Sequence, residues 1–207
     1  MRVGRGELVP GPSMGPVSRV HFVLAWGLCV AGLLITLVSW LPGPGKVPTT
    51  AAVAVFAAAI PVFGAALLRS IFSERARTLL RRDGGGMGRS IGVRPLLAFL
   101  RTLPTGLRCA YVLVLVVFAL AMLTGGAAED ARADGNGRYY HTHWKRPEQR
   151  TERVWLTEAE YHEATRARTR VFASAAMLFH GVAGFLVLVA APAAPPSVAR
   201  REETARP

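Results

Sequence analysis

Residues 171–191 read VFASAAMLFHGVAGFLVLVAA, an apolar run without Asp, Glu, Lys or Arg. A helix rises 1.5 Å per residue, so about 20 apolar residues cross the ~30 Å hydrocarbon core of a bilayer. The run lies in a gap between Arg170 and Arg200 that holds no charged side chain. It therefore predicts a membrane-spanning helix.

Three earlier parts of the chain have the same character. Apolar runs fill the uncharged gaps between the basic residues, and they predict further spans at about residues 20–41, 50–72 and 107–126. The predicted fold is an all-α membrane protein, a four-transmembrane-helix bundle formed by residues 20–191.

Composition narrows the possible functions. The chain has 207 residues, of which 51% are hydrophobic, and a formal net charge of +12. Four spans leave too little of it for a soluble catalytic domain of ordinary size. In a soluble protein this charge would suggest nucleic acid, but beside membrane spans it is explained by positive-inside bias and by anionic lipid headgroups. We expect no enzyme activity, no cofactor and no nucleic-acid partner.

The distribution of basic residues predicts the orientation. The connection from Arg69 to Arg108 carries nine arginines and two acids, whereas the connection over residues 125–170 carries nine basic and eight acidic residues. The positive-inside rule counts basic residues, so these two loops tie. The basic tails, 1–19 and 192–207, decide the matter.

Both tails, read as disordered, and the basic loop 73–106 are therefore expected in the cytoplasm, and segment 127–170 is expected to be exported. The expected location is the bacterial cytoplasmic membrane. Three arginines before the fourth span stand against this orientation: Arg166, Arg168 and Arg170.

The basic inner loop contains two stretches with helical character. Residues 69–82 are expected to extend the second span, and the glycine-rich run 84–88 is expected to form a hinge. Residues 93–103 carry leucines at helical spacing and predict a short interfacial helix. The favoured interpretation of the arginines is a topology signal, and the alternative is a surface for anionic lipid headgroups or a partner.

The exported segment predicts a small hairpin followed by a helix. Residues 138–144, RYYHTHW, alternate like a strand, and residues 153–156, RVWL, fit the returning strand. Thr157 and Glu160 fit a capping box, so a helix is expected to start there and to run into the fourth span.

Three histidines of this segment form a candidate metal site. His141 and His143 share one strand face, and a His-x-His pair with His162 would suit zinc or copper. No third ligand is fixed by spacing, so the favoured interpretation is surface histidines beside aromatic residues at the membrane interface.

The first span carries a continuous line of small residues. They follow one another at intervals of four, three, four and three: Ala25, Cys29, Gly32, Thr36 and Ser39. Small side chains let membrane helices approach closely, so this line predicts a helix-packing seam. The second span is alanine-rich, and Pro61 is expected to kink it.

The fourth span has a small face and a bulky face. The small residues lie within about 60° of His180 at 100° per residue: Ala173, Ala176, Ala183 and Gly184. The bulky residues lie opposite and are expected to face lipid: Leu178, Val182, Phe185 and Val189.

His180 is then expected to point into the bundle near mid-membrane. An ionisable residue at that depth is a functional candidate by default. The favoured interpretation is a neutral histidine bonded to Thr36, Ser39 or a backbone carbonyl, and the alternative is a proton or ligand site.

Residues 137–140, GRYY, and 154–161, VWLTEAEY, together with the helix that leads into the last span, resemble small uncharacterised four-span membrane proteins of actinobacteria. The resemblance covers about the last third of the chain. It implies a membrane location and carries no assigned activity.

Two functional hypotheses follow. The first is a non-enzymatic interaction or structural protein of the membrane or envelope, whose exported aromatic segment contacts a membrane-protein partner or a second copy in a homo-oligomer. The second is a small transporter or channel that uses His180, which would require a continuous polar path or a broken helix at midplane.

Overall fold

The computed structural model describes residues 14–41, 48–74, 76, 93–125, 131–145 and 150–191. Within these ranges the side chains of residues 93–96, 143–145, 150 and 151 are not described. The expected hinge at 84–88 and the tail 192–207 lie outside the described residues.

Four long helices dominate the structure: α1 (Pro16–Ser39), α2 (Thr49–Phe72), α5 (Thr105–Gly125) and α6 (Glu158–Ala190). In the described part of the chain, these are the helices long and apolar enough to cross a membrane. The first helix begins earlier than expected, because Pro16 suits the first helical position. Pro61 lies inside α2 without ending it.

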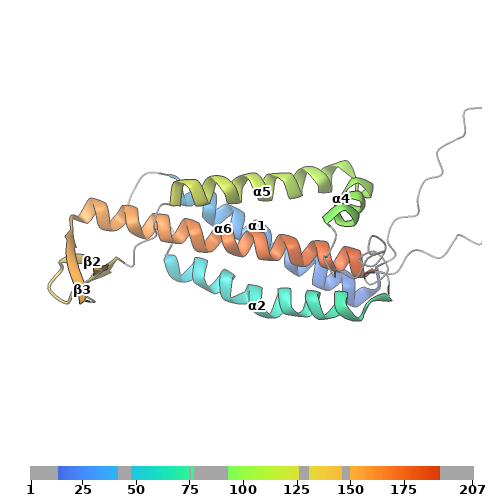
Figure 1. The fold of residues 1–207 in the computed structure, drawn as a ribbon, viewed down its shortest axis with the longest axis horizontal. Coiled ribbons are helices and arrows are strands. Elements are labelled where there is room, and N and C mark those ends of the chain that lie inside the picture. The colour runs from blue at the N-terminus through green and yellow to red at the C-terminus, as the bar shows by residue number, and fades with distance from the viewer. Residues whose placement is uncertain are drawn as a thin grey trace, which may run out of the picture.

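α6 is the central helix of the bundle. It packs against α1, α2 and α5, which lie around it (Figure 1). The expectation that its bulky face meets lipid is wrong for Val189, which is buried, and incomplete for Phe185, which is half-buried. Phe185 packs edge-to-face on Tyr111 of α5 and on Phe99, so protein covers much of this face.

α2 ends more sharply than expected. Ser73 adopts an extended conformation after Phe72, so the prediction of one helix through residues 69–82 is wrong at this point. The Ser73 hydroxyl donates to the Ala190 carbonyl of α6 at 3.1 Å and accepts from the Ala76 amide at 3.4 Å. A serine hydroxyl that bonds to nearby backbone groups in this way competes with the helical hydrogen bonds and favours a break in the helix.

The short helix α4 (Val93–Thr102) lies where an interfacial helix is expected. Phe99 of α4 and Leu103, the residue after this helix, are buried with Tyr111 in a common apolar cluster. α4 therefore packs on the bundle as well as presenting exposed residues.

A small antiparallel sheet follows α5 in sequence. Its strands are β1 (Arg132–Ala133), β2 (Tyr139–Lys145) and β3 (Arg150–Leu156), in the order β1-β2-β3. β1 extends the expected hairpin to three strands. The Asp134 carboxylate closes the β1–β2 turn by accepting from two backbone amides, and Gly137 has φ +74°.

The sheet connects directly to α6. The capping box is present, with the Thr157 hydroxyl accepting from the Glu160 amide and the Glu160 carboxylate accepting from the Thr157 amide. The helix of 33 residues that starts there measures about 50 Å, longer than the ~30 Å core of a bilayer. Its first turns project beyond the bundle and reach the sheet (Figure 1).

Candidate functional site

Helices α1 and α6 approach closely at Gly32. The five small residues of the seam are the buried residues of α1. A Cβ atom added at Gly32 would lie 2.9 Å from the Ala173 carbonyl oxygen and 3.1 Å from the Met177 Cβ. The two backbones therefore meet at a distance that only glycine allows at this position.

His180 is completely buried on α6. Its Nε2 lies 3.1 Å from the carbonyl oxygen of Val55 on α2. A carbonyl oxygen only accepts, so Nε2 must carry the hydrogen of this bond. Nδ1 is buried and has no hydrogen-bond partner among the described residues.

Of the three partners that the sequence suggests for His180, namely Thr36, Ser39 and a backbone carbonyl, the structure shows the backbone carbonyl. The Thr36 hydroxyl instead donates to the Gly32 carbonyl at 2.8 Å, and the Ser39 hydroxyl donates to the Thr36 carbonyl at 2.6 Å. Both hydroxyl hydrogens are thus used within α1, so neither hydroxyl donates to the histidine.

Arg170, which the sequence shows only as a charged residue before the fourth span, is buried in the structure. Its guanidinium donates to the Thr124 carbonyl at 2.7 Å, to the Ser39 carbonyl at 3.3 Å and to the Ser39 hydroxyl at 3.4 Å. It also lies over the Trp40 ring at 5.7 Å. Both carbonyls belong to the C-terminal ends of helices, α5 and α1, where a cation compensates the helix dipole and the free carbonyls.

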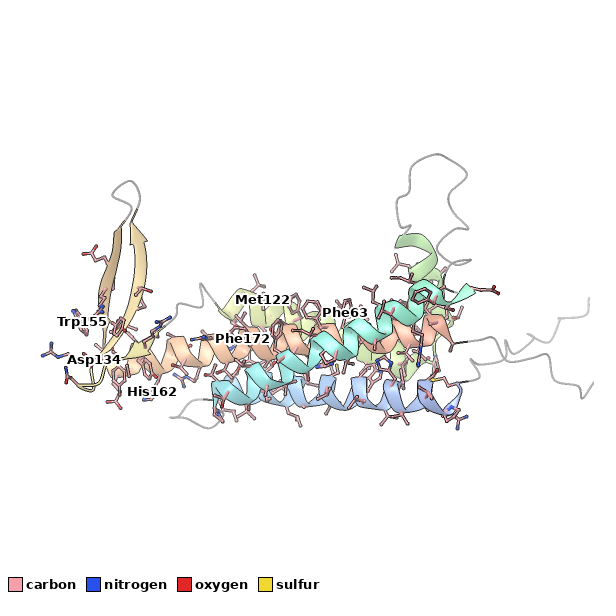
Figure 2. All side chains as sticks on the ribbon, turned by 90° about the horizontal axis from the view of Figure 1, so that it is seen from below. Phe63, Met122, Asp134, Trp155, His162 and Phe172 are labelled. Atoms are coloured by element: carbon pink, nitrogen blue, oxygen red, sulfur yellow. The ribbon has the colours of Figure 1, made fainter. Side chains whose placement is uncertain are left out.

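Arginines and aromatic rings cover the sheet. Tyr140 pairs with Trp155 across β2 and β3, and their rings lie edge-to-face at 5.9 Å. Arg153 lies over the Tyr140 ring at 5.1 Å, and Arg138 lies over the Trp155 ring at 5.8 Å. Figure 2 shows Trp155 on the sheet, at the end of the molecule far from the α4 end of the bundle.

The other face of β2 turns toward α6. Tyr139 stacks on Tyr161 with ring centroids 4.2 Å apart and an interplanar angle of 17°. This contact joins the sheet to the first turns of the helix.

Among the side chains that the structure describes, His141 and His162 form no metal site. His162 lies 3.6 Å from Glu158 on its own helix, and His141 lies on β2 opposite Val154. In the described residues no group of three His, Cys, Asp or Glu side chains is placed to hold a metal ion. The side chain of His143 is outside the described part.

Comparisons with known proteins add no identity to this geometry. No protein family, no curated protein and no solved structure matches the chain.

Proposed function

We propose that this chain is a non-enzymatic protein of the bacterial cytoplasmic membrane whose sheet recognises a partner in the membrane or envelope. The observation that carries the proposal is the continuity of α6, a single helix from the sheet to the far end of the bundle. A surface held without a flexible joint loses less entropy on binding, because it is already ordered.

The chemistry of the sheet supports the proposal. Trp155 is 52% exposed, and Arg138 and Arg153 are exposed beside it. Arg138 and Arg153 lie over the aromatic rings beside them. Exposed Trp, Tyr and Arg residues in one patch are the types that contribute most to binding energy at protein interfaces.

The proposed orientation places both termini in the cytoplasm and the sheet outside, as the basic tails favour. A reporter inserted after Asn136, in the exposed turn between β1 and β2, tests this orientation. We expect activity from a reporter that works only after export. Activity from a cytoplasm-specific reporter at the same position would overturn the orientation.

The second candidate, a transporter or channel, rests on Nδ1 of His180, for which the described residues supply no hydrogen-bond partner. Two other features of the bundle argue against a transporter or channel. The buried hydroxyls of Thr36, Ser39 and Ser174 all bond to carbonyls of their own helices. Both helices that meet at His180, α2 and α6, continue through the bundle, whereas transporter sites typically use broken helices.

Site-directed photo-crosslinking in intact cells tests the recognition role. A photoreactive residue replaces Trp155. The control position is Leu123, which is 80% exposed and lies near the C-terminal end of α5. We expect a discrete adduct from position 155 and none from 123. An adduct of twice 22.2 kDa would identify the partner as a second copy of this chain.

Two variants separate the candidates. Arg138→Glu with Arg153→Glu should remove the adduct, and His180→Leu should leave it in place. If position 155 yields no discrete adduct, the recognition role is overturned. If a folded His180→Leu protein reproduces the phenotype of a gene deletion while the arginine variant does not, the transporter hypothesis replaces it.

A further inference from the structure

An apolar groove of about 200 Å³ lies between α4, α5 and α6. Its walls come from three helices, and they include Leu97 and Leu100 of α4, Tyr111 and Leu115 of α5, and Leu178, Val182 and Phe185 of α6. The groove has no polar lining. It is separate from the sheet, because its α4 wall lies at the opposite end of the bundle (Figure 1).

Two arginines stand at one end of this groove. Arg108 precedes Tyr111 and Leu115 by three and seven residues, so all three lie on one face of α5. Arg101 follows Leu97 by four residues and lies on the same face of α4. Only Leu103 and Pro104 separate α4 from α5, which keeps the two arginines at the same end.

The arginines retain capacity to bind an anion. Arg101 is exposed. Arg108 donates through Nη2 to the Thr105 hydroxyl at 3.2 Å, and its enclosed Nε has no hydrogen-bond partner within the described residues. α5 begins three residues before Arg108, and the N-terminus of a helix attracts negative charge.

We infer that this groove is a binding site for one anionic phospholipid. Its phosphate lies at Arg101 and Arg108, and a segment of one acyl chain fills the groove. The spacing suits this occupant, because the apolar wall of α5 extends about 10 Å from Arg108 to Leu115. A groove that is apolar along its length and cationic at one end matches a molecule with an anionic head and a hydrocarbon tail.

The inference goes beyond the recognition role proposed for the sheet and does not depend on which side of the membrane the arginines face. A zwitterionic lipid would fill the groove with an acyl chain but would leave the arginines without a net negative partner. The discriminating property is therefore the headgroup charge at constant acyl chains.

Native mass spectrometry of the full-length protein, released from detergent micelles, measures the retained lipid. The probes are phosphatidylglycerol and phosphatidylcholine with identical palmitoyl and oleoyl chains. We expect one phosphatidylglycerol to be retained in preference to phosphatidylcholine. Arg101→Gln with Arg108→Gln should lower that retention roughly tenfold.

Arg19→Gln with Arg69→Gln is the matched control. It removes two arginines from the same end of the molecule, on α1 and α2, away from the groove. It should leave the retention unchanged. An equal loss in both double variants would show that net charge alone attracts the lipid, and would overturn the site.

The groove itself is tested by filling it from either wall. Val182→Trp on α6 and Leu115→Trp on α5 should each lower phosphatidylglycerol retention at least fivefold while helix content stays unchanged. Two walls are used so that one misfolded variant leaves the other informative. Full retention in either folded variant, or equal retention of both lipids by the unchanged protein, would overturn the inference.

Discussion

Arg170 offers the sharpest test of how the bundle is held together. Replacement by methionine removes the guanidinium and keeps an unbranched apolar stem. The bond to the Thr124 carbonyl is short, at 2.7 Å, while the two bonds to Ser39 are 3.3 and 3.4 Å long. The guanidinium also lies 3.9 Å from the Glu163 carboxylate. The change therefore removes one strong hydrogen bond, two weak ones and one long ion pair.

The magnitude follows from these distances. A hydrogen bond from a charged donor contributes about 1.5–3 kcal/mol, and the stacking on Trp40 contributes about 0.5–1 kcal/mol more. The two long bonds add little, because they lie at the limit of hydrogen-bond geometry. We expect Arg170→Met to lower the free energy of unfolding by about 2–4 kcal/mol.

Reversible unfolding in mixed detergent micelles, followed by far-ultraviolet circular dichroism, measures this change. Arg166→Met is the control, because Arg166 forms a partly exposed ion pair with Glu163 at 2.7 Å and should cost less than about 1 kcal/mol. Arg170→Lys should fall between the two, since an ammonium cannot reproduce the fork of the guanidinium. If Arg170→Met costs no more than the control, Arg170 does not cap the two helix ends.

Three further changes test other parts of the structure. Gly32→Ala forces a Cβ against backbone atoms and should cost about 1–3 kcal/mol in the same unfolding assay, whereas Gly27→Ala, which meets open space, should be neutral or stabilising. His180→Leu removes one bond to a neutral carbonyl and should stay within about 1.5 kcal/mol of the unchanged protein; a larger loss would mean that the histidine holds α2 in place. The bonds that the Thr157 backbone amide and hydroxyl donate to the Glu160 carboxylate lower the pKa of that group. The cap is therefore fully formed above the ordinary glutamate pKa and is lost as pH falls through the lowered value, which Cα chemical shifts of the first turn of α6 would report. Glu160→Gln should abolish this pH dependence, and a persistent one would assign it to another group.

The sequence predicts much of this bundle because its signals are local. An uncharged apolar run reports a span, and small residues at intervals of three and four report a face that can approach another helix. The buried residues of α1 are those of the predicted seam, from Ala25 to Ser39. The capping box at Thr157 likewise depends only on residues close in sequence.

Three features were not predicted from the sequence. Two of them depend on tertiary contacts, and the third depends on a local turn. Arg170 reads as an ordinary flank of a span until the ends of α1 and α5 are seen beside it. Ser73, where α2 ends, donates its hydroxyl to the Ala190 carbonyl of α6, a contact that the sequence does not show. The third strand had a local signal, since residues 134–137, Asp-Gly-Asn-Gly, are typical of a tight turn.

The central position of α6 explains why one helix carries so many different contacts. Its small face receives α1 at Gly32, and its histidine bonds to α2. Further along, the Ser70 hydroxyl of α2 donates to the Leu186 carbonyl, so polar groups of α2 meet α6 at two depths. α1 and α2 thus pack on a helix whose first turns also support the sheet through the stack of Tyr139 on Tyr161. Because α6 is continuous, a partner bound to the sheet as we propose would act on a helix that the bundle holds along most of its length.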